Sequence, residues 1–427
     1  MSIIQKIIRI KERLIDLWTN YTLFKYAVIV HLGYFVVSLI LVLTVLREQN
    51  DFLIYFTAGG VFYNDLNNLY NQEHYFWDFR YLPLSAAIFV PFYLLGFELG
   101  FIVFQFLNLL VNILTCVILY KIIALVRRGD HEKDDKRVIL FICIYLMAVP
   151  HIFNYILGQI NSFVAYFVLL SLYIFLKYDK LKWQFYGSFI LGLSIIIKPA
   201  ALFMIPFLLV INRGIKQRKK IRIDILKSAI RLIGVIFPIS FNLILFILYP
   251  KLWEGFIATN FTGGNPLTLN FSFSISKLIV NFCYIYNIPF NQLIILFGVL
   301  IIIGFLGFII YVKGKFEQNN AIIYGLTLGM LIMLLGYFDS WDHHLLILIP
   351  LLIIIIFNLP RNSEITTKFM RKSFIFFSFF DLIFMGIWFL TTPFWFPYNF
   401  ASTIFLILVF YGIFKYGFYQ TNKSKGD

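Results

Sequence analysis

Residues 24–59 read FKYAVIVHLGYFVVSLILVLTVLREQNDFLIYFTAG, and this stretch decides the fold. Its first part, Phe24–Leu46, is apolar over a length that spans a bilayer as a helix. The second part begins at Asp51, a carboxylate placed just beyond the predicted span. A carboxylate at the mouth of a membrane-embedded cavity is a candidate for proton chemistry, so we take Asp51 as the centre of the predicted site.

The composition of the whole chain is that of an integral membrane protein. Of its 427 residues, 61% are hydrophobic and only 13% are charged, and the mean hydropathy is +0.85. A soluble domain of this composition could not keep a hydrated surface. Apolar runs of about 20 residues recur along the chain, which is typical of helices and not of barrel strands. We therefore expect an all-α fold and a single polytopic domain over residues 1–427.

The net charge of +15 does not indicate a nucleic-acid partner. The basic residues lie in short clusters between apolar runs, as cytoplasmic loops do under the positive-inside rule. Residues 1–22 are basic and amphipathic, which predicts a cytoplasmic helix at the membrane interface. The cysteines lie in or beside apolar runs without ligand spacing, which favours packing over metal binding; they are Cys116, Cys143 and Cys283.

Assigning the basic clusters to the cytoplasm predicts about twelve crossings with both termini inside. Residues 47–98 then form a first outer loop, and residues 250–290 form a long one. Residues 82–97, with Pro83 and Pro91, could cross or lie at the interface, and the interfacial alternative puts every later basic loop inside. The predicted crossings are 24–46, 100–126, 138–155, 160–176, 185–197, 200–211, 226–249, 293–312, 321–338, 345–357, 374–390 and 401–416.

Two of these runs, 185–197 and 200–211, are short for a span and meet at Lys198-Pro199. Proline breaks a helix and frees backbone carbonyls, which are tolerated only beside protein or a cavity. We interpret the runs as a bent pair whose apex opens to an outer cavity. Lys198 could bind a phosphate there, because a lysine among apolar residues suggests function; the alternative is a side chain that snorkels to the interface.

This topology brings polar residues from separate segments to one side of the membrane. Asp51 could be a general base whose pKa is raised by desolvation, or it could cap a short helix. Arg80 could bind a phosphate through its guanidinium, or it could snorkel. The amides of Gln159 and Asn161, at an outer turn, could bind sugar hydroxyls or satisfy backbone groups of the turn.

The segment Asp339–His344 places four titratable groups and a tryptophan at another outer turn. Adjacent histidines on a helix point about 100° apart and lack the spacing of zinc ligands, so His343 and His344 do not favour a metal. For Trp341, Asp342 and the two histidines we favour contacts with a phosphate or with sugar hydroxyls. An interfacial belt of tryptophan and histidine is the alternative.

Five motifs, in order along the chain, resemble the GT-C superfamily of glycosyltransferases that use polyprenyl-phosphate sugars. They are Asp51-Phe-x-x-Tyr55-x-x-Ala-Gly, Phe79-Arg80-Tyr81-x-Pro83-Leu84, Gly158-Gln159-x-Asn161, Gly192-Leu-Ser-Ile-Ile-Ile-Lys198-Pro199 and Ser340-Trp341-x-His343-His344. Their combination is similar to family 87, which includes α-1,2-mannosyltransferases that act on lipid-linked glycans. The chain departs from the family at Leu82, where a second proline is usual, and in its longer and more polar Asn-rich segment 64–72.

The resemblance implies a polyprenyl- or dolichyl-phosphate sugar as donor, with mannose the expected sugar, and a lipid-linked or glycan acceptor. It implies Asp51 as the general base, inversion at the anomeric carbon, and donor-phosphate contacts from Arg80, Lys198 and His344. Contacts to sugar and acceptor would come from Tyr55, Gln159, Asn161, Trp341, Asp342 and His343. Fixed cations at the phosphate remove the need for a metal or another cofactor. The enzyme would lie in the plasma membrane of a prokaryote, with its site on the extracytoplasmic face.

Two other functions stay open on the sequence alone. A transporter of lipid-linked sugars would also explain the spans and Lys198, but it predicts internal pseudo-symmetry, and the sequence has no evident repeat. A protein O-mannosyltransferase of the same superfamily would commonly carry paired acidic residues in the first outer loop. Asp51 has no adjacent acidic partner, although Asp65, Glu73 and Asp78 follow.

Overall fold

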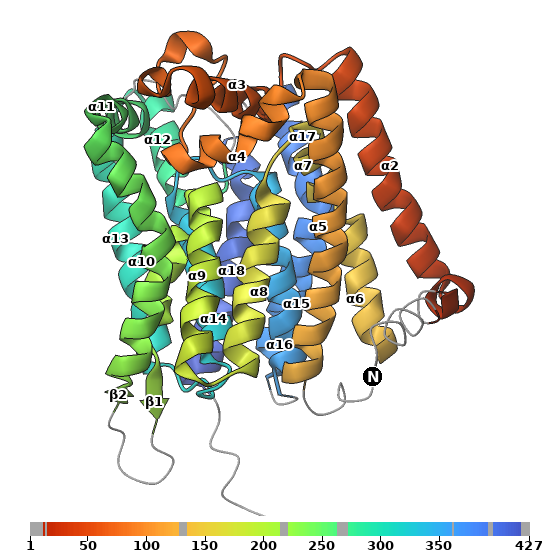
Figure 1. The fold of residues 1–427 in the computed structure, drawn as a ribbon. Helices are drawn as coiled ribbons and strands as arrows, with labels where there is room; N and C mark the ends of the chain where they lie inside the picture. The colour runs from red at the N-terminus through yellow and green to blue at the C-terminus, as the bar shows by residue number, and fades with distance from the viewer. Residues whose placement is uncertain are drawn as a thin grey trace, which may run out of the picture.

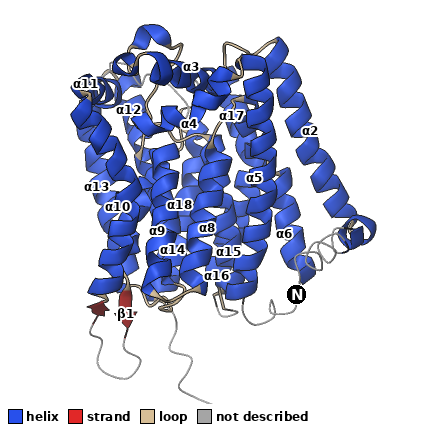
Figure 2. Ribbon diagram, in the orientation of Figure 1, coloured by secondary structure: helices blue, strands red, loops and turns tan. Residues whose placement is uncertain are grey.

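The protein is a bundle of helices with a helical cap across one end (Figure 1). The computed structural model describes residues 12, 15–127, 135–213, 221–262, 272–360, 363–391 and 396–419. Helices α3, α4 and α11 lie at the capped end, and the short antiparallel strands β1 (Ile211–Arg213) and β2 (Ile221–Ile223) lie at the opposite end (Figure 2). The predicted all-α class is confirmed, with this hairpin as a small addition.

Six helices in the described part of the chain are long and apolar enough to cross a membrane. They are α2 (Thr22–Thr44), α5 (Phe97–Val126), Asp135–Ile156, α10 (Ile225–Leu248), α13 (Gln292–Lys313) and α18 (Ala401–Phe418). Within the third, α6 (Asp135–Met147) and α7 (Pro150–Ile156) are separated just before Pro150. The chain is an integral membrane protein with several spanning helices, whereas the number of twelve crossings stays a prediction.

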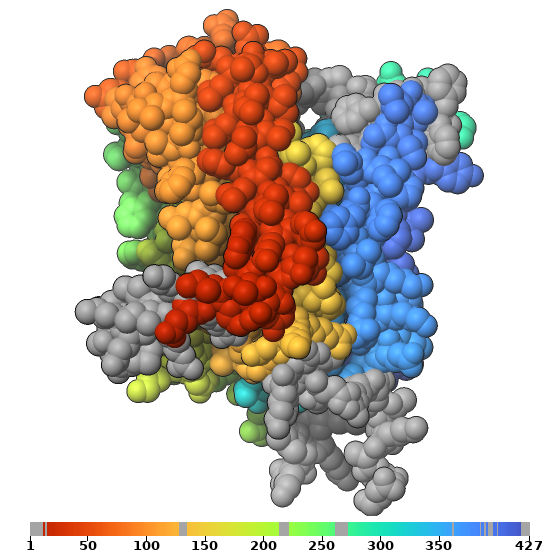
Figure 3. All heavy atoms as spheres, turned by 90° about the vertical axis from the view of Figure 1, so that its right-hand side faces the viewer, coloured from red at the N-terminus to blue at the C-terminus, as the bar shows by residue number. Residues whose placement is uncertain are grey.

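Helix α2 lies on the outer surface of the bundle, alongside α6 (Figure 3). Its side chains Ile29, Val36 and Ile40 are each about half exposed, at 55%, 49% and 58%. An apolar surface of this kind is stable against lipid and would be unstable against water. The exposed face of α2 therefore supports the membrane assignment that composition indicates.

The remaining predicted crossings coincide with shorter helical segments, some of them buried at the centre of the bundle and others exposed at its surface, as Leu390 is at 86%. They are α8 (Asn161–Lys177), α9 (Leu181–Ile197), η4 (Pro199–Leu208), α14 (Ala321–Gly336), α15 (Leu345–Asn358), and the continuous run of α16 (Glu364–Ile375), η7 (Phe376–Phe380) and α17 (Asp381–Thr391). Helices α14 and α15 are buried along their whole length. Sequence runs of continuous Leu and Ile thus form the centre of the molecule.

The first predicted outer loop contains more helix than its polar composition indicates. Asp51 is the first residue of α3 (Asp51–Asn64), which is followed by η1 (Leu66–Asn68), η2 (Gln72–His74) and α4 (Pro83–Leu94). Helix α4 has 12 residues, which is about 18 Å and too short for a bilayer core of about 30 Å. It packs on α3 at the capped end, as the interfacial alternative for residues 82–97 expects (Figure 1).

The predicted bend between α9 and η4 is present. Helix α9 ends at Ile197, Lys198 is extended, and Pro199 begins the 3-10 helix η4. Because β1 follows η4 at the uncapped end, the bend lies at the other end of the pair, toward the cap. Helix α9 thus runs toward the cap, and η4 returns toward the uncapped end.

Two other predicted regions lie partly outside the described residues. Of the predicted interfacial helix over 1–22, residues 15–20 are helical. Of the long loop 250–290, the structure describes α11 (Pro250–Ile257), η5 (Ala258–Thr262) and α12 (Ile275–Ile285), and residues 263–271 fall outside it.

Candidate active site

Asp51 is held at the first turn of α3 by backbone contacts. Its backbone N–H donates to the carbonyl of Leu157, at 2.8 Å from N to O. The side chain of Asn50 caps the helix by accepting from the N–H of Leu53 at 3.0 Å. The capping function that the sequence left open for Asp51 therefore belongs to Asn50, and the partly buried carboxylate of Asp51 is left for other contacts.

The turn between α7 and α8 approaches Asp51 because residue 158 is a glycine. Gly158 has a φ of +62°, and a Cβ atom there would lie 2.5 Å from the Cβ of Phe52. Both the backbone conformation and the contact exclude a larger residue without a shift of the chain. The glycine thus lets this turn rest on the first turn of α3, which brings Gln159 to Asp51.

Gln159 joins the predicted base to a predicted cation. Its Nε2 donates to Oδ2 of Asp51, and its Oε1 accepts from Nζ of Lys198 at 3.0 Å. Oε1 also accepts from the hydroxyl of Tyr55 at 3.2 Å and from Nδ2 of Asn161 at 3.4 Å. The partners fix the orientation of the amide, because a carboxylate only accepts and an ammonium only donates. Five residues that were predicted separately thus form one connected group, called the Asp51 group below: Asp51, Tyr55, Gln159, Asn161 and Lys198.

Lys198 reaches this group because the chain breaks at Pro199. The break frees the carbonyl of Ile197, which accepts from the hydroxyl of Ser85 on α4 at 3.3 Å. The side chain of Lys198 is 7% exposed, and its Nζ lies 6.0 Å from the centre of the Tyr81 ring. The lysine is therefore directed into the bundle beneath α4, and the snorkelling alternative does not describe it.

Burial brings the pKa values of Asp51, the predicted base, and Lys198, the predicted cation, toward neutrality. Desolvation raises the pKa of Asp51 to about 6, against the opposing effects of Lys198 and Gln159. Desolvation likewise lowers the pKa of Lys198 to about 7, against the opposing charges of Asp51 and Asp339. A carboxylate with a raised pKa can accept a proton at neutral pH and remains a competent base.

Two tyrosines complete the wall of the site. The hydroxyls of Tyr55 and Tyr81 are 2.8 Å apart, and the ring of Tyr55 stacks on Phe89 with centroids 4.7 Å apart. The carbonyl of Tyr81 accepts from the hydroxyl of Tyr70 at 2.7 Å. Tyr81 has no role in the sequence-based prediction, although its place in the Phe-Arg-Tyr motif was the signal that could have found it.

Arg80 lies in an ion pair. Its Nη1 is 2.8 Å from Oδ2 of Asp339, and its Nη2 is 3.7 Å from Oδ2 of Asp78. Both Arg80 and Asp339 are about one-third exposed, so the pair borders the site and is not sealed inside it. Asp339 is a second residue without a role in the prediction, and its position beside the Trp-x-His-His motif was the available signal.

The histidines of the outer turn are buried close to Lys198. The turn η6 (Asp342–His344) places the rings of His343 and His344 with centroids 4.4 Å apart. Nδ1 of His344 accepts from the backbone N–H of Trp341 at 3.2 Å. The charge of Lys198 acts on both rings, which locates them on the same side of the bundle as the Asp51 group.

Asp342 has a different environment from its neighbours. Its carboxyl is 5% exposed and lies against that of Asp381 at the start of α17. The hydroxyl of Ser402 donates to Oδ1 of Asp381. Two carboxyl groups in such contact are stable only if they share a proton or a cation. Through Asp381 and Ser402, Asp342 is thus connected to the C-terminal helices α17 and α18.

The predicted absence of a metal stays an expectation. In the ranges that the structure describes, no group of three or more His, Cys, Asp or Glu side chains has the arrangement of a metal site. The Asp51 group offers one carboxylate together with amides, phenols and an ammonium.

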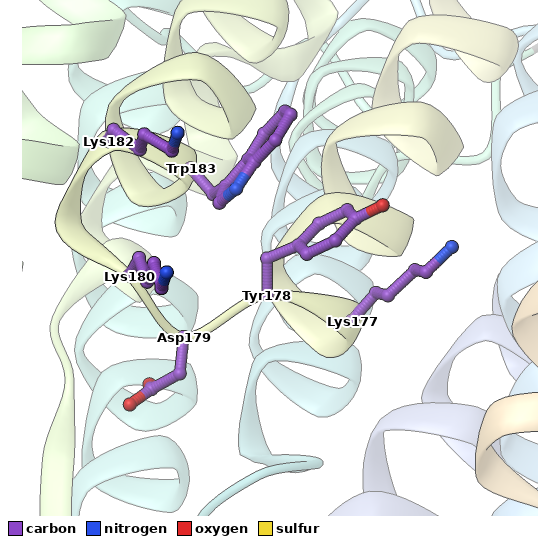
Figure 4. Close-up of a pocket in the computed structure, with 6 residues that line it drawn as sticks. All are labelled: Lys177, Tyr178, Asp179, Lys180, Lys182 and Trp183. Atoms are coloured by element: carbon purple, nitrogen blue, oxygen red, sulfur yellow. The ribbon is translucent and has the colours of Figure 1, made fainter.

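A separate hollow of about 520 Å³ lies at the turn between α8 and α9 (Figure 4), which is at the uncapped end of the bundle (Figure 1). Its lining consists of Lys177, Tyr178, Asp179, Lys180, Lys182 and Trp183. The rings of Tyr178 and Trp183 stack there with centroids 4.5 Å apart. Lysine and aromatic side chains are typical of a membrane–water interface, and this hollow has no part in the site at the cap.

The sequence profile of glycosyltransferase family 87 matches residues 79–336, which is more than half of the chain. The chain belongs to glycosyltransferase family 87. It is a membrane glycosyltransferase, and its reaction requires a sugar donor and an acceptor. Arg80, Gln159 and Lys198 lie inside the matched stretch, and Asp51 precedes it. No curated protein and no solved structure matches this glycosyltransferase.

Proposed function

We propose that this glycosyltransferase moves a sugar, with mannose the expected one, from a polyprenyl- or dolichyl-phosphate donor to a hydroxyl of a lipid-linked or glycan acceptor. The observation that carries the proposal is the chain of hydrogen bonds from Asp51 through Gln159 to Lys198. A carboxylate suits the deprotonation of a hydroxyl, and an ammonium suits a phosphate. Both groups stand side by side, as transfer from a phosphate to a hydroxyl requires.

The proposed reaction is a single displacement. The acceptor oxygen attacks the anomeric carbon while Asp51 takes its proton. The bond between that carbon and the phosphate oxygen breaks, and its electron pair stays on the phosphate, which gains a negative charge. Lys198, with Arg80 and His344, offsets this charge. Attack opposite the leaving group inverts the anomeric carbon, so a β-linked donor gives an α-glycoside.

The remaining predicted residues would contact the sugar and the acceptor. Oδ1 of Asn161 supports this, because it is buried and has no hydrogen-bond partner in the described residues. A buried amide oxygen without a donor is costly, and a sugar hydroxyl would supply one. The full set proposed for these contacts is Tyr55, Gln159, Asn161, Trp341, Asp342 and His343.

We place the capped end outside the cell and both termini in the cytoplasm. The lysines of the turn between α8 and α9 support this orientation, because that turn lies at the opposite end of the bundle from α3, which begins at Asp51 (Figure 1). A polyprenyl donor would then enter from the bilayer, and the host membrane would be the plasma membrane of a prokaryote.

A transfer assay tests the proposal. Purified protein in lipid nanodiscs receives radiolabelled polyprenyl-phosphate mannose and a membrane lipid extract, and labelled glycolipid is measured. We expect transfer that Asp51→Asn reduces by about 10²- to 10⁴-fold, the usual contribution of a general base. Asp65→Asn is the matched control, because Asp65 is an exposed carboxylate at the other end of the same helix.

Two outcomes would contradict the proposal. Full activity of Asp51→Asn would remove Asp51 from the chemistry. Label that crosses the membrane of reconstituted vesicles without forming a new glycosidic bond would identify a transporter instead.

A further inference from the structure

The ion pair of Arg80 with Asp339 stands where the proposed mechanism needs a free cation. The guanidinium is expected to bind the donor phosphate, yet its Nη1 is 2.8 Å from Oδ2 of Asp339. Asp339 comes from the segment between α14 and η6, which is 259 positions from Arg80 in the sequence. The contact therefore links the first outer segment to the turn that carries the two histidines.

Two ammonium groups add to the positive charge around Asp339. Lys198 and Lys277 both act on it electrostatically, and they are 7% and 1% exposed. Lys277 lies near the start of α12, in the long segment between α10 and α13. Arg80 thus contacts Asp339 directly, and the charges of two lysines from other parts of the chain act on the same carboxylate. A carboxylate and a phosphate present oxygens that a guanidinium binds in the same way.

We propose that Asp339 is an exchangeable counter-ion of the cation cluster formed by Arg80, Lys198 and Lys277. The donor phosphate displaces Asp339 from Arg80, and Asp339 returns to Arg80 as the polyprenyl phosphate leaves. This inference rests on the proposed function, because it takes the phosphate of the donor as the competing anion. Asp339 is a positioning residue in this account, since it acts through Arg80 and makes no contact with the reacting atoms.

The change of charge during the reaction gives the counter-ion its use. The donor is a phosphodiester with one negative charge, and the leaving polyprenyl phosphate is a monoester with up to two. Three cations would therefore hold the product more tightly than the donor. A carboxylate that competes for one of them weakens the binding of the product, and it also limits the repulsion among the cations when no phosphate is bound.

The test compares product binding in charge variants of residue 339. A short-chain polyprenyl monophosphate is titrated into the full-length protein in nanodiscs, and inhibition of transfer by the same compound is measured in parallel. We expect Asp339→Asn to tighten product binding by about fivefold, the upper end of the effect of one partly exposed charge pair. The variant should lower kcat and the donor KM together, because release becomes slow.

Two further variants separate competition from a structural effect. Asp339→Glu keeps the charge and should restore product affinity to within about twofold of the wild type. Asp78→Asn is the matched control, because it removes the other carboxylate near the same guanidinium at the longer distance of 3.7 Å. It should change product affinity by less than about twofold.

Product affinity that is unchanged or weaker in Asp339→Asn, with the protein still folded by thermal unfolding, would overturn the inference. The binding titration does not depend on turnover, so it separates this result from a failure of the proposed function. Tighter product binding in Asp339→Asn without transfer from any polyprenyl-phosphate sugar would support the counter-ion and overturn the donor. If Asp339→Asn and Asp339→Glu bind the product with equal affinity and sugar transfer is normal, the counter-ion inference alone would be overturned.

Discussion

Nζ of Lys198 lies 3.0 Å from Oε1 of Gln159, and the same amide donates to Asp51 through its other end. The proposed base and the proposed phosphate-binding cation are therefore held by one side chain. A displacement of the amide changes both groups at once, so Gln159 determines the geometry of the site even though it has no acid–base chemistry of its own.

We expect Gln159→Leu to lower kcat/KM by about 10- to 100-fold, because a buried hydrogen bond to a charged group contributes roughly 1.5–3 kcal/mol. The loss should be smaller when Asp51→Asn is already present, since the two residues act as a unit. Gln72→Leu is the control, as Gln72 is an exposed amide at the same end of the bundle. Additive losses in the double variant would show that the amide and the base act independently.

The pH dependence of kcat/KM should have two limbs. Activity should rise as Asp51 loses its proton near pH 6, because only the carboxylate can accept a proton. It should fall as Lys198 loses its proton near pH 7, because only the ammonium attracts the phosphate. Bound donor phosphate stabilises the ammonium, so the alkaline limb of kcat should lie at higher pH than that of kcat/KM.

Lys198→Arg is the diagnostic variant for the alkaline limb. Its guanidinium stays charged over the accessible pH range, so the limb should disappear while the acid limb stays. Steady-state kinetics from pH 5 to about 9 measure both limbs. An alkaline limb that persists in Lys198→Arg would assign it to another group.

Lys198→Gln should raise the KM for the donor by about 10- to 100-fold and leave the KM for the acceptor nearly unchanged, since the lost contact is to the phosphate. Separate titrations of donor and acceptor measure the two constants. Lys177→Gln, at the hollow on the opposite end of the bundle, is the matched control and should have no effect on either constant. A larger change in the acceptor constant would place Lys198 on the acceptor side.

Gly158→Ala should destabilise the protein by about 2 kcal/mol or more and reduce transfer, because the alanine Cβ would meet Phe52 in a left-handed backbone conformation. Thermal unfolding in detergent and the transfer assay measure the two effects. Gly33→Ala is the control, since a Cβ at Gly33 in α2 meets no atom within 4 Å. Equal unfolding temperatures for the two variants would contradict the steric argument.

Much of the architecture and part of the site could be predicted from the sequence. Apolar runs predict the helices, because both the lipid and the protein core select apolar side chains. The break after Ile197 was predictable because proline cannot continue a helix. The helix over Asp51–Asn64 was missed, although Phe52, Tyr55 and Ala58 recur at helical spacing and are all buried. The positions between them are also apolar, as at Leu53, Phe56 and Val61, so the segment has no alternation of polar and apolar faces that would indicate a helix.

The contacts of Arg80 and Asp342 could not be predicted. Arg80 meets Asp339 across 259 positions, and Asp342 meets Asp381 from a helix outside the recognised motifs. Such pairings depend on how distant helices pack, and a single sequence carries no signal of them. The order of motifs supplies candidate residues for the site, and the packing decides which of them touch.

The polar residues of the site lie where helices begin or end. Asp51 opens α3, Asn161 opens α8, Lys198 separates α9 from η4, and Asp339 follows α14. The long apolar spans between them contribute none of the four. Mutational tolerance should therefore be uneven along the chain. Apolar exchanges of similar volume would accumulate in the spans over evolutionary time. Substitutions in the few short segments between helices would be rejected much more often.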